Sequence, residues 1–225
     1  MTVSSTLHDT SAMRAFQVAE AHATPSFADV VPPLPGDGEV VIDVAACGLN
    51  FADLLMIAGT YQDTPPYPVT LGMEVAGRVA TCGRGVTGLQ PGDRVAAFTG
   101  SGGLAPQCRA QAARCVHLPD GLPFDTAAGI LVAYGTSHLA LVHRAGLRAG
   151  ETLVVLGAAG GVGLTAVEIG TALGARVVAV ARGPEKAAIA RAAGAQDVID
   201  SDAPDLRARL KGMGGVDVVY DTVGD

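Results

Sequence analysis

A glycine-rich turn over residues 153–163 carries the strongest chemical signal in this sequence. The segment reads Leu-Val-Val-Leu-Gly-Ala-Ala-Gly-Gly-Val-Gly, a short apolar strand and a turn, and an apolar-periodic helix is expected from Val162 to Leu173. Glycines let the backbone approach a pyrophosphate, whose charge is stabilised by the free amides and positive dipole end of the following helix. A second strand, Arg176 to Ala181, comes next. This order predicts a dinucleotide-binding unit, with expected cofactor contacts at Gly157, Gly160, Gly161, Val162 and Gly163.

The end of the second strand predicts which nicotinamide cofactor binds. An NAD-selective site has Asp or Glu there, where the carboxylate accepts hydrogen bonds from the ribose 2′-hydroxyl. Here the strand is followed by Arg182 and, about one helical turn later, by Lys186. Either cation can form a charge-assisted pair with a 2′-phosphate, so we expect NADP(H). The alternative is that both residues are solvated surface cations.

Two patterns divide the chain near residue 131. Residues 1–12 are polar and are expected to form a disordered tail. Over residues 13–131, Gly/Pro turns separate short strands, which predicts a small β-rich barrel; the expected strands are Glu39–Ala46, Val75–Ala80, Arg94–Phe98 and Cys115–Leu118. Over residues 132–225, strands alternate with helices, which predicts a parallel sheet with right-handed crossovers.

The second half of the chain predicts the first four strands of a doubly wound sheet. After the second strand we expect a helix from Pro184, a strand over Asp197–Ile199, a helix over Asp205–Lys211 and a strand over Val216–Tyr220. Such a sheet has the order 3-2-1-4-5-6 and binds its ligand at the switch between strands 1 and 4. We therefore expect a sheet that is truncated after strand 4 and leaves an apolar edge exposed.

Composition excludes some classes of partner. The 225 residues include 49% hydrophobic residues, and 15 Lys+Arg against 22 Asp+Glu give a net charge of −7. This balance argues against nucleic acid and favours a small-molecule partner. The four cysteines form no CxxC pair, which favours free thiols in a reducing cytoplasm. No signal peptide or membrane span is recognisable, so no membrane partner is expected.

Further motifs occur in the order and spacing of a known family. They are 45–53 (Ala-Ala-Cys-Gly-Leu-Asn-Phe-Ala-Asp), 59–61 (Gly-Thr-Tyr), 71–77 (Leu-Gly-Met-Glu-Val-Ala-Gly), 91–95 (Pro-Gly-Asp-Arg-Val) and the glycine turn. Together they resemble the zinc-free quinone oxidoreductases of the medium-chain dehydrogenase/reductase superfamily, over essentially residues 13–225. The resemblance implies a GroES-like barrel beside a Rossmann domain, a homodimer when full length, and NADPH-dependent reduction of quinones or α,β-unsaturated carbonyls.

The sequence departs from the zinc-dependent members of that superfamily. The His of their Gly-His-Glu motif is Met73 here, no His closely follows Cys47, and the four-cysteine lobe for a structural zinc is absent. We therefore expect no metal. The charge that develops on the reduced substrate would then be stabilised by hydrogen bonds or by water, which favours quinones and activated double bonds over plain alcohols.

The resemblance also implies roles for single residues. Asn50, Phe51 and Asp53 would line the nicotinamide end of the site, and Tyr61 would direct its hydroxyl toward the substrate. Thr136 would touch the cofactor and Thr222 the nicotinamide ribose. Structural alternatives stay open: Asp53 could cap a helix, Tyr61 could pack at a rim, and the two threonines could be cap or turn residues.

Two other functions fit the same motifs. Gly48-Leu49-Asn50-Phe51 followed by Asp53 also resembles enoyl reductases of the polyketide-synthase type. A non-catalytic NADP-binding module, or an inactive fragment, would keep the nucleotide fold without turnover. Oxidation of NADPH by a quinone would distinguish the enzyme from the module.

Overall fold

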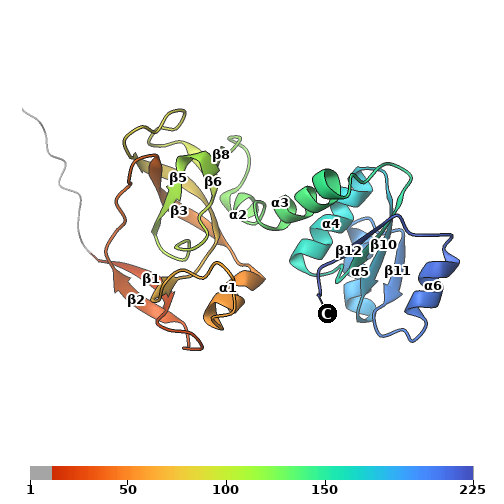
Figure 1. Ribbon diagram of the computed structural model, residues 1–225. Coiled ribbons are helices and arrows are strands. Elements are labelled where there is room, and N and C mark those ends of the chain that lie inside the picture. Colours follow the sequence, from red (N-terminus) through yellow and green to blue (C-terminus); the bar gives the residue numbers. More distant parts are fainter. Residues whose placement is uncertain (1–11, 225) are drawn as a thin grey trace, which may run out of the picture. The chain divides into compact units, whose positions relative to one another are not determined.

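The computed structural model describes residues 12–224, and the tail expected over residues 1–12 lies outside this range except for its last residue. The chain divides into two compact units, Met1–Val132 (unit 1) and Ala133–Asp225 (unit 2), which are distinguished by colour in Figure 1. Each unit has its own hydrophobic core. Within the described range, no helix combines the length and the apolar character that a membrane crossing requires.

Unit 1 is built from antiparallel strands. A five-stranded sheet has the order β7-β3-β5-β6-β8, and a three-stranded sheet has the order β2-β1-β4. The strands are β1 (Met13–Val18), β2 (Ser26–Val30), β3 (Glu39–Gly48), β4 (Val69–Thr70), β5 (Glu74–Cys82), β6 (Arg94–Phe98), β7 (Gln107–Gln111) and β8 (Cys115–His117). The described residues of this unit also form three short helical segments: α1 (Phe51–Ile57), η1 (Ala112–Arg114) and α2 (Phe124–Ala128).

The two longest strands form the centre of the larger sheet. Small and β-branched side chains on one face of β3, β5 and β6 make a buried cluster that includes Val40, Ile42, Val75 and Val95. The pairing of β3 with β5 is very close at Gly77, where a β-carbon would lie 2.0 Å from the carbonyl oxygen of Asp43. Only glycine fits this approach. The pairing fixes β3 against β5 and so positions the residues that follow β3.

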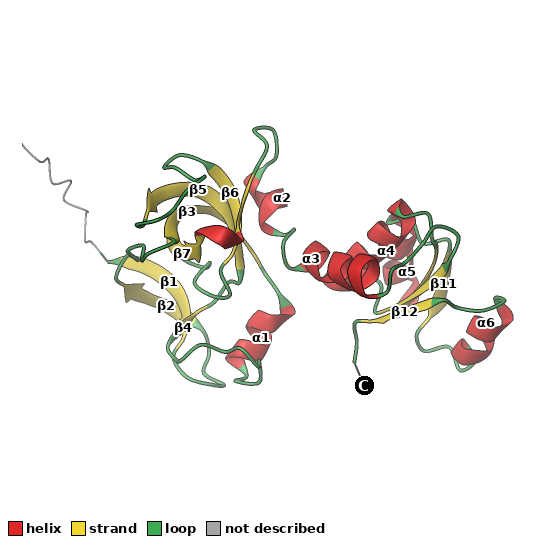
Figure 2. Cartoon of the chain, turned by 45° about the horizontal axis from the view of Figure 1, so that its top comes forward, coloured by secondary structure: helices red, strands yellow, loops and turns green. Residues whose placement is uncertain are grey.

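Unit 2 is a four-stranded parallel sheet of order β11-β10-β9-β12, of which Figure 2 labels β11 and β12. In chain order this is 3-2-1-4, which confirms the predicted doubly wound arrangement. The strands are β9 (Thr152–Leu156), β10 (Arg176–Ala181), β11 (Asp197–Asp200) and β12 (Val218–Asp221). The helical segments are α3 (Ala133–His138), η2 (Leu139–Arg144, a π-helix), α4 (Gly161–Ala172), α5 (Gly183–Ala192) and α6 (Leu206–Gly212).

Helices cover both faces of this sheet, as its strand sequences require. Leu153 and Val155 of β9 face a cluster that contains residues of η2, α4 and α5, whereas Val154 faces a second cluster with Leu206 and Leu210 of α6. A strand that is buried on both faces reads as a continuous apolar run rather than an alternating one. The run Leu-Val-Val-Leu in β9 is therefore explained by its central place in the sheet.

Sequence pattern misses several elements of unit 1. It does not predict β1, β2, β4, β7 or α2, and in unit 2 β12 begins two residues later than the predicted strand. β7 reads Gln-Cys-Arg-Ala-Gln, and only Cys108 and Ala110 are buried. Because the buried side chains are small and alternate with polar ones, the hydrophobic alternation of this strand is too weak to recognise in the sequence. The strand nevertheless pairs with five consecutive residues of β3.

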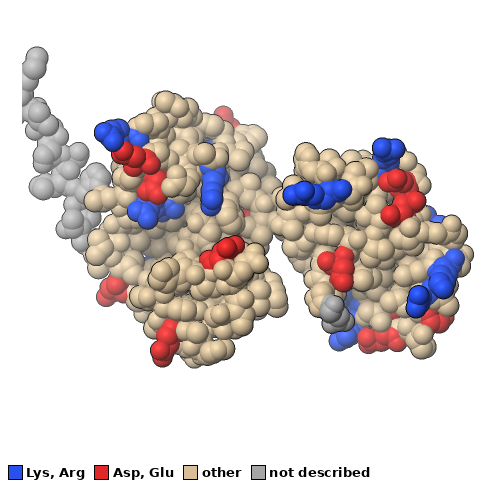
Figure 3. Space-filling view, viewed as in Figure 1, with Lys and Arg blue, Asp and Glu red and all other residues tan. Residues whose placement is uncertain are grey.

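Charged side chains are mixed on the surface. On the face drawn in Figure 3, Lys and Arg are interspersed with Asp and Glu and form no continuous basic area. Over the described residues, several surface charges are paired, including Arg176 with Asp197 and Arg209 with Asp205. The face in view therefore has no feature typical of a phosphate-backbone surface.

Candidate nucleotide and substrate sites

The glycine turn connects β9 to α4 through positions that exclude side chains. Gly157 adopts a φ of +70°. A β-carbon at Gly163 would lie 2.2 Å from the carbonyl oxygen of Gly157, and one at Gly157 would lie 2.6 Å from Thr222 Oγ1. Gly160 donates its N–H to Gly157 O at 2.9 Å and precedes the helix as its N-cap. The turn therefore packs as tightly as a pyrophosphate-binding turn requires.

The first amides of α4 are open to a ligand. The N-cap residue is Gly160, and no side chain of the described range caps this end of the helix. The first turn of an α-helix has N–H groups without intrahelical partners. A β-carbon at Gly161 would meet no atom within 4 Å, so there is open space at this point. Free amides, the helix dipole and open space are the features that let a helix start bind an anion, and Val162 belongs to the same turn.

Thr222 lies beside this turn. Its hydroxyl donates a hydrogen bond to Leu156 O at 2.8 Å, across the β9–β12 pair. This contact holds the residues after β12 against the end of β9, where the strand order reverses. The predicted Thr222 and the predicted glycines are thus brought together by the fold.

Thr136 lies on α3 and is exposed. Its neighbours on this helix contact α4, which the sequence does not predict. Ser137 is fully buried, and its Oγ donates to Val162 O at 2.8 Å and lies 2.8 Å from Thr165 Oγ1. Tyr134 donates its hydroxyl to Glu168 of α4, which raises the pKa of Tyr134. These contacts fasten α3 to the first half of α4 and so position Thr136.

The end of β10 carries the two cations that are predicted to bind a 2′-phosphate. Lys186 on α5 is exposed and forms no ion pair with any residue of the described range. Arg182 is already paired, because its Nε lies 3.2 Å from Asp202 Oδ1. Asp200, at the end of β11, accepts an N–H from Gly183 at 3.2 Å. Sequence reasoning misses both acids, since they lie at the end of the third strand and in the loop after it.

In unit 1, Asp53 organises the start of α1. Asn50 is the N-cap of the helix, and its backbone N–H donates to Asp53 Oδ2 at 2.9 Å. The other oxygen, Oδ1, accepts the N–H of Gly72 at 2.9 Å. Asp53 is only 6% exposed, so its carboxylate acts on the backbone of this unit. This geometry is the helix-capping role that the sequence leaves open beside the catalytic one.

Glu74 is the second buried acid, and sequence reasoning misses it. It is 2% exposed; its Oε1 accepts from Asn50 Nδ2 at 3.0 Å and its Oε2 accepts the N–H of Val132 at 3.0 Å. A β-carbon at Gly48 would lie 2.7 Å from Glu74 Oε1, so the chain leaves room for the carboxylate. A signal is present, because Glu74 is the one charged residue in the apolar segment 71–77.

Tyr61 lines a cavity of about 420 Å³ in unit 1. Its ring is half-buried and packs with the cluster that contains Met56, Leu71 and Met73. The walls of the cavity combine apolar and polar side chains, among them Met73, Phe98, Thr99, Ser101 and Arg114. Phe51, in contrast, is 73% exposed on α1. A cavity with one phenol, one guanidinium and an apolar wall suits a small, partly polar molecule.

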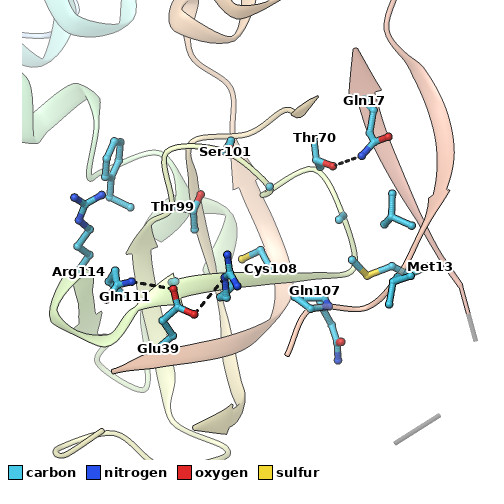
Figure 4. Close-up of a pocket in the computed structure, with 18 residues that line it drawn as sticks. Met13, Gln17, Glu39, Thr70, Thr99, Ser101, Gln107, Cys108, Gln111 and Arg114 are labelled. Atoms are coloured by element: carbon cyan, nitrogen blue, oxygen red, sulfur yellow. Dashed lines mark hydrogen bonds and ion pairs between the residues drawn. The ribbon is translucent and has the colours of Figure 1, made fainter. Parts of the chain in front are cut away.

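A separate cavity of about 510 Å³ lies beside β1 and β7 and contains none of the predicted site residues (Figure 4). Gln17 Nε2 donates to Thr70 Oγ1 at 2.8 Å there, and Gln111 Nε2 donates to Glu39 Oε1 at 2.9 Å. Because these polar groups already satisfy one another, few are left to orient a ligand. Arg114 lines this cavity as well as the one at Tyr61.

Cys47 lies in a setting that disfavours its thiolate form. Burial, with smaller contributions from Asp53 and Glu74, raises the pKa of Cys47 to about 12. A thiol of this kind is protonated at neutral pH and is a poor nucleophile. Among residues 12–224, no group of three or more His, Cys, Asp or Glu side chains has an arrangement that could hold a metal ion.

Two family models match the chain. The alcohol dehydrogenase GroES-like domain matches residues 36–147, and the zinc-binding dehydrogenase domain matches residues 161–225. The first match falls mainly on the strands of unit 1 and the second on the glycine turn and the rest of unit 2.

Named relatives agree with these matches. The chain is 38% identical over 200 residues to quinone oxidoreductase-like protein 2 of Mus musculus, covering 87% of this chain but 57% of the relative. It is 35% identical to quinone oxidoreductase of Sus scrofa, covering 96% of this chain and 67% of the relative. Quinone oxidoreductase from Thermus thermophilus, solved alone and with NADPH, matches with a TM-score of 0.83 and 36% identity, over 95% of this chain and 68% of that one.

Proposed function

From the fact that this chain belongs to the quinone oxidoreductase family of the medium-chain dehydrogenase/reductase superfamily, we propose that the protein is an NADPH-dependent oxidoreductase. It reduces quinones or α,β-unsaturated carbonyls and uses no zinc. The observation that carries this proposal is the glycine turn at the uncapped start of α4, where a β-carbon at Gly163 would collide with the turn itself. Relatives named as quinone oxidoreductases support the reaction class.

Unit 2 supplies the residues that hold the nucleotide. The free amides at Gly161, Val162 and Gly163 bind the pyrophosphate, and Gly157 and Gly160 let it approach. Lys186 and Arg182 bind the 2′-phosphate at the end of β10. Thr136 and Thr222 contact the nicotinamide ribose half. When bound, NADPH supplies the hydride.

Unit 1 supplies the proton and the substrate cavity. Reduction of a quinone or enone adds a hydride to an electron-poor carbon and leaves negative charge on the oxygen. The Tyr61 hydroxyl, which forms no hydrogen bond with other residues of the described range and lines the cavity, donates a proton to that oxygen. Asn50 presents its side chain from a fixed position, because Glu74 accepts from its amide and Asp53 accepts from its backbone.

The side chains that stand where zinc-dependent relatives have ligands do not fit zinc. Zinc in proteins prefers thiolate, imidazole and carboxylate ligands. Here the corresponding segment offers the Met73 thioether, and the Glu74 oxygens already accept N–H groups from Asn50 and Val132. The chemistry proposed for unit 1 therefore depends on hydrogen-bond donors and involves no metal.

The first experiment is a fluorescence titration of the chain with NADPH and with NADH. We expect NADPH to bind at least about tenfold more tightly, which corresponds to about 1.4 kcal/mol. Lys186→Ala should remove this preference, whereas Lys211→Ala, which removes another exposed lysine on α6, should keep it. Equal binding of the two nucleotides would contradict the cofactor assignment.

The second step is an assay of NADPH oxidation with a quinone and with an enone. Turnover that falls at least about tenfold in Tyr61→Phe, while NADPH affinity is unchanged, would support the role of the hydroxyl. Binding without turnover of either substrate would support a nucleotide-binding module instead.

A further inference from the structure

Two carboxylates lie where the 2′-phosphate of NADPH would bind. Asp202 Oδ1 is 3.2 Å from Arg182 Nε, so the cation that is expected to bind phosphate already has an anionic partner. Asp200 is paired in register with Ala181, the last residue of β10. Both acids therefore lie at the edge of the sheet where a doubly wound fold recognises the adenosine ribose.

Asp200 also accepts a hydrogen bond from a backbone N–H group that a phosphate oxygen would otherwise use. Its Oδ2 accepts the N–H of Gly183, the first residue of α5, and its Oδ1 accepts the N–H of Asp202 at 3.0 Å. The second bond fixes the backbone of Asp202, while Ser201 Oγ donates to Asp202 Oδ1 at 3.4 Å. Asp202 is thus held toward Arg182 by the loop that follows β11.

We propose that Asp202 is a selectivity-determining residue of this chain, which weakens its preference for a 2′-phosphorylated nucleotide by neutralising Arg182. This inference rests on the proposed function, since it assumes that nucleotide binds along β10 and α5. The 2′-phosphate of NADPH must then displace the Asp202 carboxylate from Arg182, whereas NADH has no 2′-phosphate and displaces nothing. Lys186, which has no acidic partner in the described range, provides the remaining preference.

The exposure of the pair makes this exchange feasible. The side chains of Arg182 and Asp202 are 74% and 64% exposed. Ion pairs of this kind are weak and are screened by solvent and salt, so a phosphate can displace the carboxylate. The displaced Asp202 still repels the phosphate at close range. Its removal should therefore favour the phosphorylated ligand only.

Asp202→Asn is the direct test, because it removes one charge and keeps the size of the side chain. The matched control is Asp197→Asn, which breaks a comparable ion pair with Arg176, 2.7 Å apart, at the opposite end of the same two strands. Asp200 is not varied, because its carboxylate also caps α5. The probes are adenosine 2′,5′-bisphosphate and adenosine 5′-monophosphate, whose binding to each chain is measured by calorimetry.

The expected result is specific to one variant and one ligand. Asp202→Asn should bind the bisphosphate about three- to tenfold more tightly at low salt, the size of one nearby charge, and bind the monophosphate as before. Asp197→Asn should match the wild-type chain for both ligands. In an Arg182→Gln background the gain from Asp202→Asn should shrink, because the effect depends on Arg182.

Other outcomes would overturn the inference. If the wild-type chain prefers the bisphosphate and Asp202→Asn leaves that preference unchanged, Asp202 has no role in selectivity, although the proposed function stands. If both ligands change together, Asp202 affects the loop and not the phosphate. If the wild-type chain binds neither ligand, the proposed nucleotide site fails and the inference fails with it.

Discussion

Glu74 is a buried acid without a cationic neighbour among its hydrogen-bond partners. Its two oxygens accept from the Asn50 side chain and from the Val132 backbone, at 3.0 Å each. A buried carboxylate is costly unless its oxygens are hydrogen-bonded, and here both are. Glu74 therefore joins the helix start at Asn50 to the last residue of unit 1.

The variant Glu74→Gln tests this arrangement. A glutamine keeps the shape but has one acceptor, so its NH₂ group must face a backbone or side-chain donor. We expect a loss of about 1–3 kcal/mol in the free energy of unfolding, measured with urea. The exposed Glu20→Gln is the control and should change stability by less than about 0.5 kcal/mol. Equal stability of the two variants would mean that the Glu74 hydrogen bonds are not needed.

At the scale of the element, the glycines of the turn before α4 are not equivalent. Gly163 lies against Gly157 O, whereas a β-carbon at Gly161 would meet no atom within 4 Å. The steric requirement for glycine is therefore strict at one position and absent at the other, although both lie in the first turn of the same helix.

The matched pair Gly163→Ala and Gly161→Ala measures this difference. Gly163→Ala should lower the free energy of unfolding by about 1–3 kcal/mol, because the new methyl group forces the turn and the helix apart. It should also lower NADPH affinity at least about tenfold. Gly161→Ala should fold with wild-type stability. If the Gly163→Ala and Gly161→Ala variants were equally stable, the turn would accommodate a methyl group at residue 163, and the steric argument would be wrong.

Elements differ in how far sequence predicts them. The glycine turn, β9, α4 and β10 are predicted because their signals are contiguous and chemically specific. The roles of Glu74 and Asp202 are not, because their partners Asn50 and Arg182 are 24 and 20 residues away, and only the fold brings them together. β7 is missed because its buried positions hold the small residues Cys108 and Ala110, and β1 is missed because its buried residues, Ala15 and Val18, are three positions apart and give no alternation.

For the whole molecule, the two units differ in chemistry as well as in fold. Every cysteine, namely Cys47, Cys82, Cys108 and Cys115, belongs to unit 1, and the predicted phosphate contacts belong to unit 2. Burial raises the pKa of Cys108 to about 12 and that of Cys115 to about 11. A raised pKa lowers the thiolate fraction below pH 9, so these thiols react slowly until unit 1 unfolds.

Thiol labelling can therefore report on unit 1 while a ligand acts on unit 2. At pH 8 the folded Cys47 and Cys108 should react with iodoacetamide about a thousandfold more slowly than in urea-unfolded chain, because a pKa of about 12 rather than 9 leaves about a thousandth of the thiolate.

Adenosine 2′,5′-bisphosphate at 100 times its Kd should stabilise unit 2 by about 2.7 kcal/mol, seen as slower amide exchange in β9 and α4. Because each unit has its own core, the urea midpoint of thiol labelling should stay where it is. If the ligand instead raised the urea midpoint of thiol labelling as much as it protects the amides of β9 and α4, the two units would unfold as one cooperative body. Ligand binding to the parallel sheet would then also stabilise the buried strands around Ile42 and Val75.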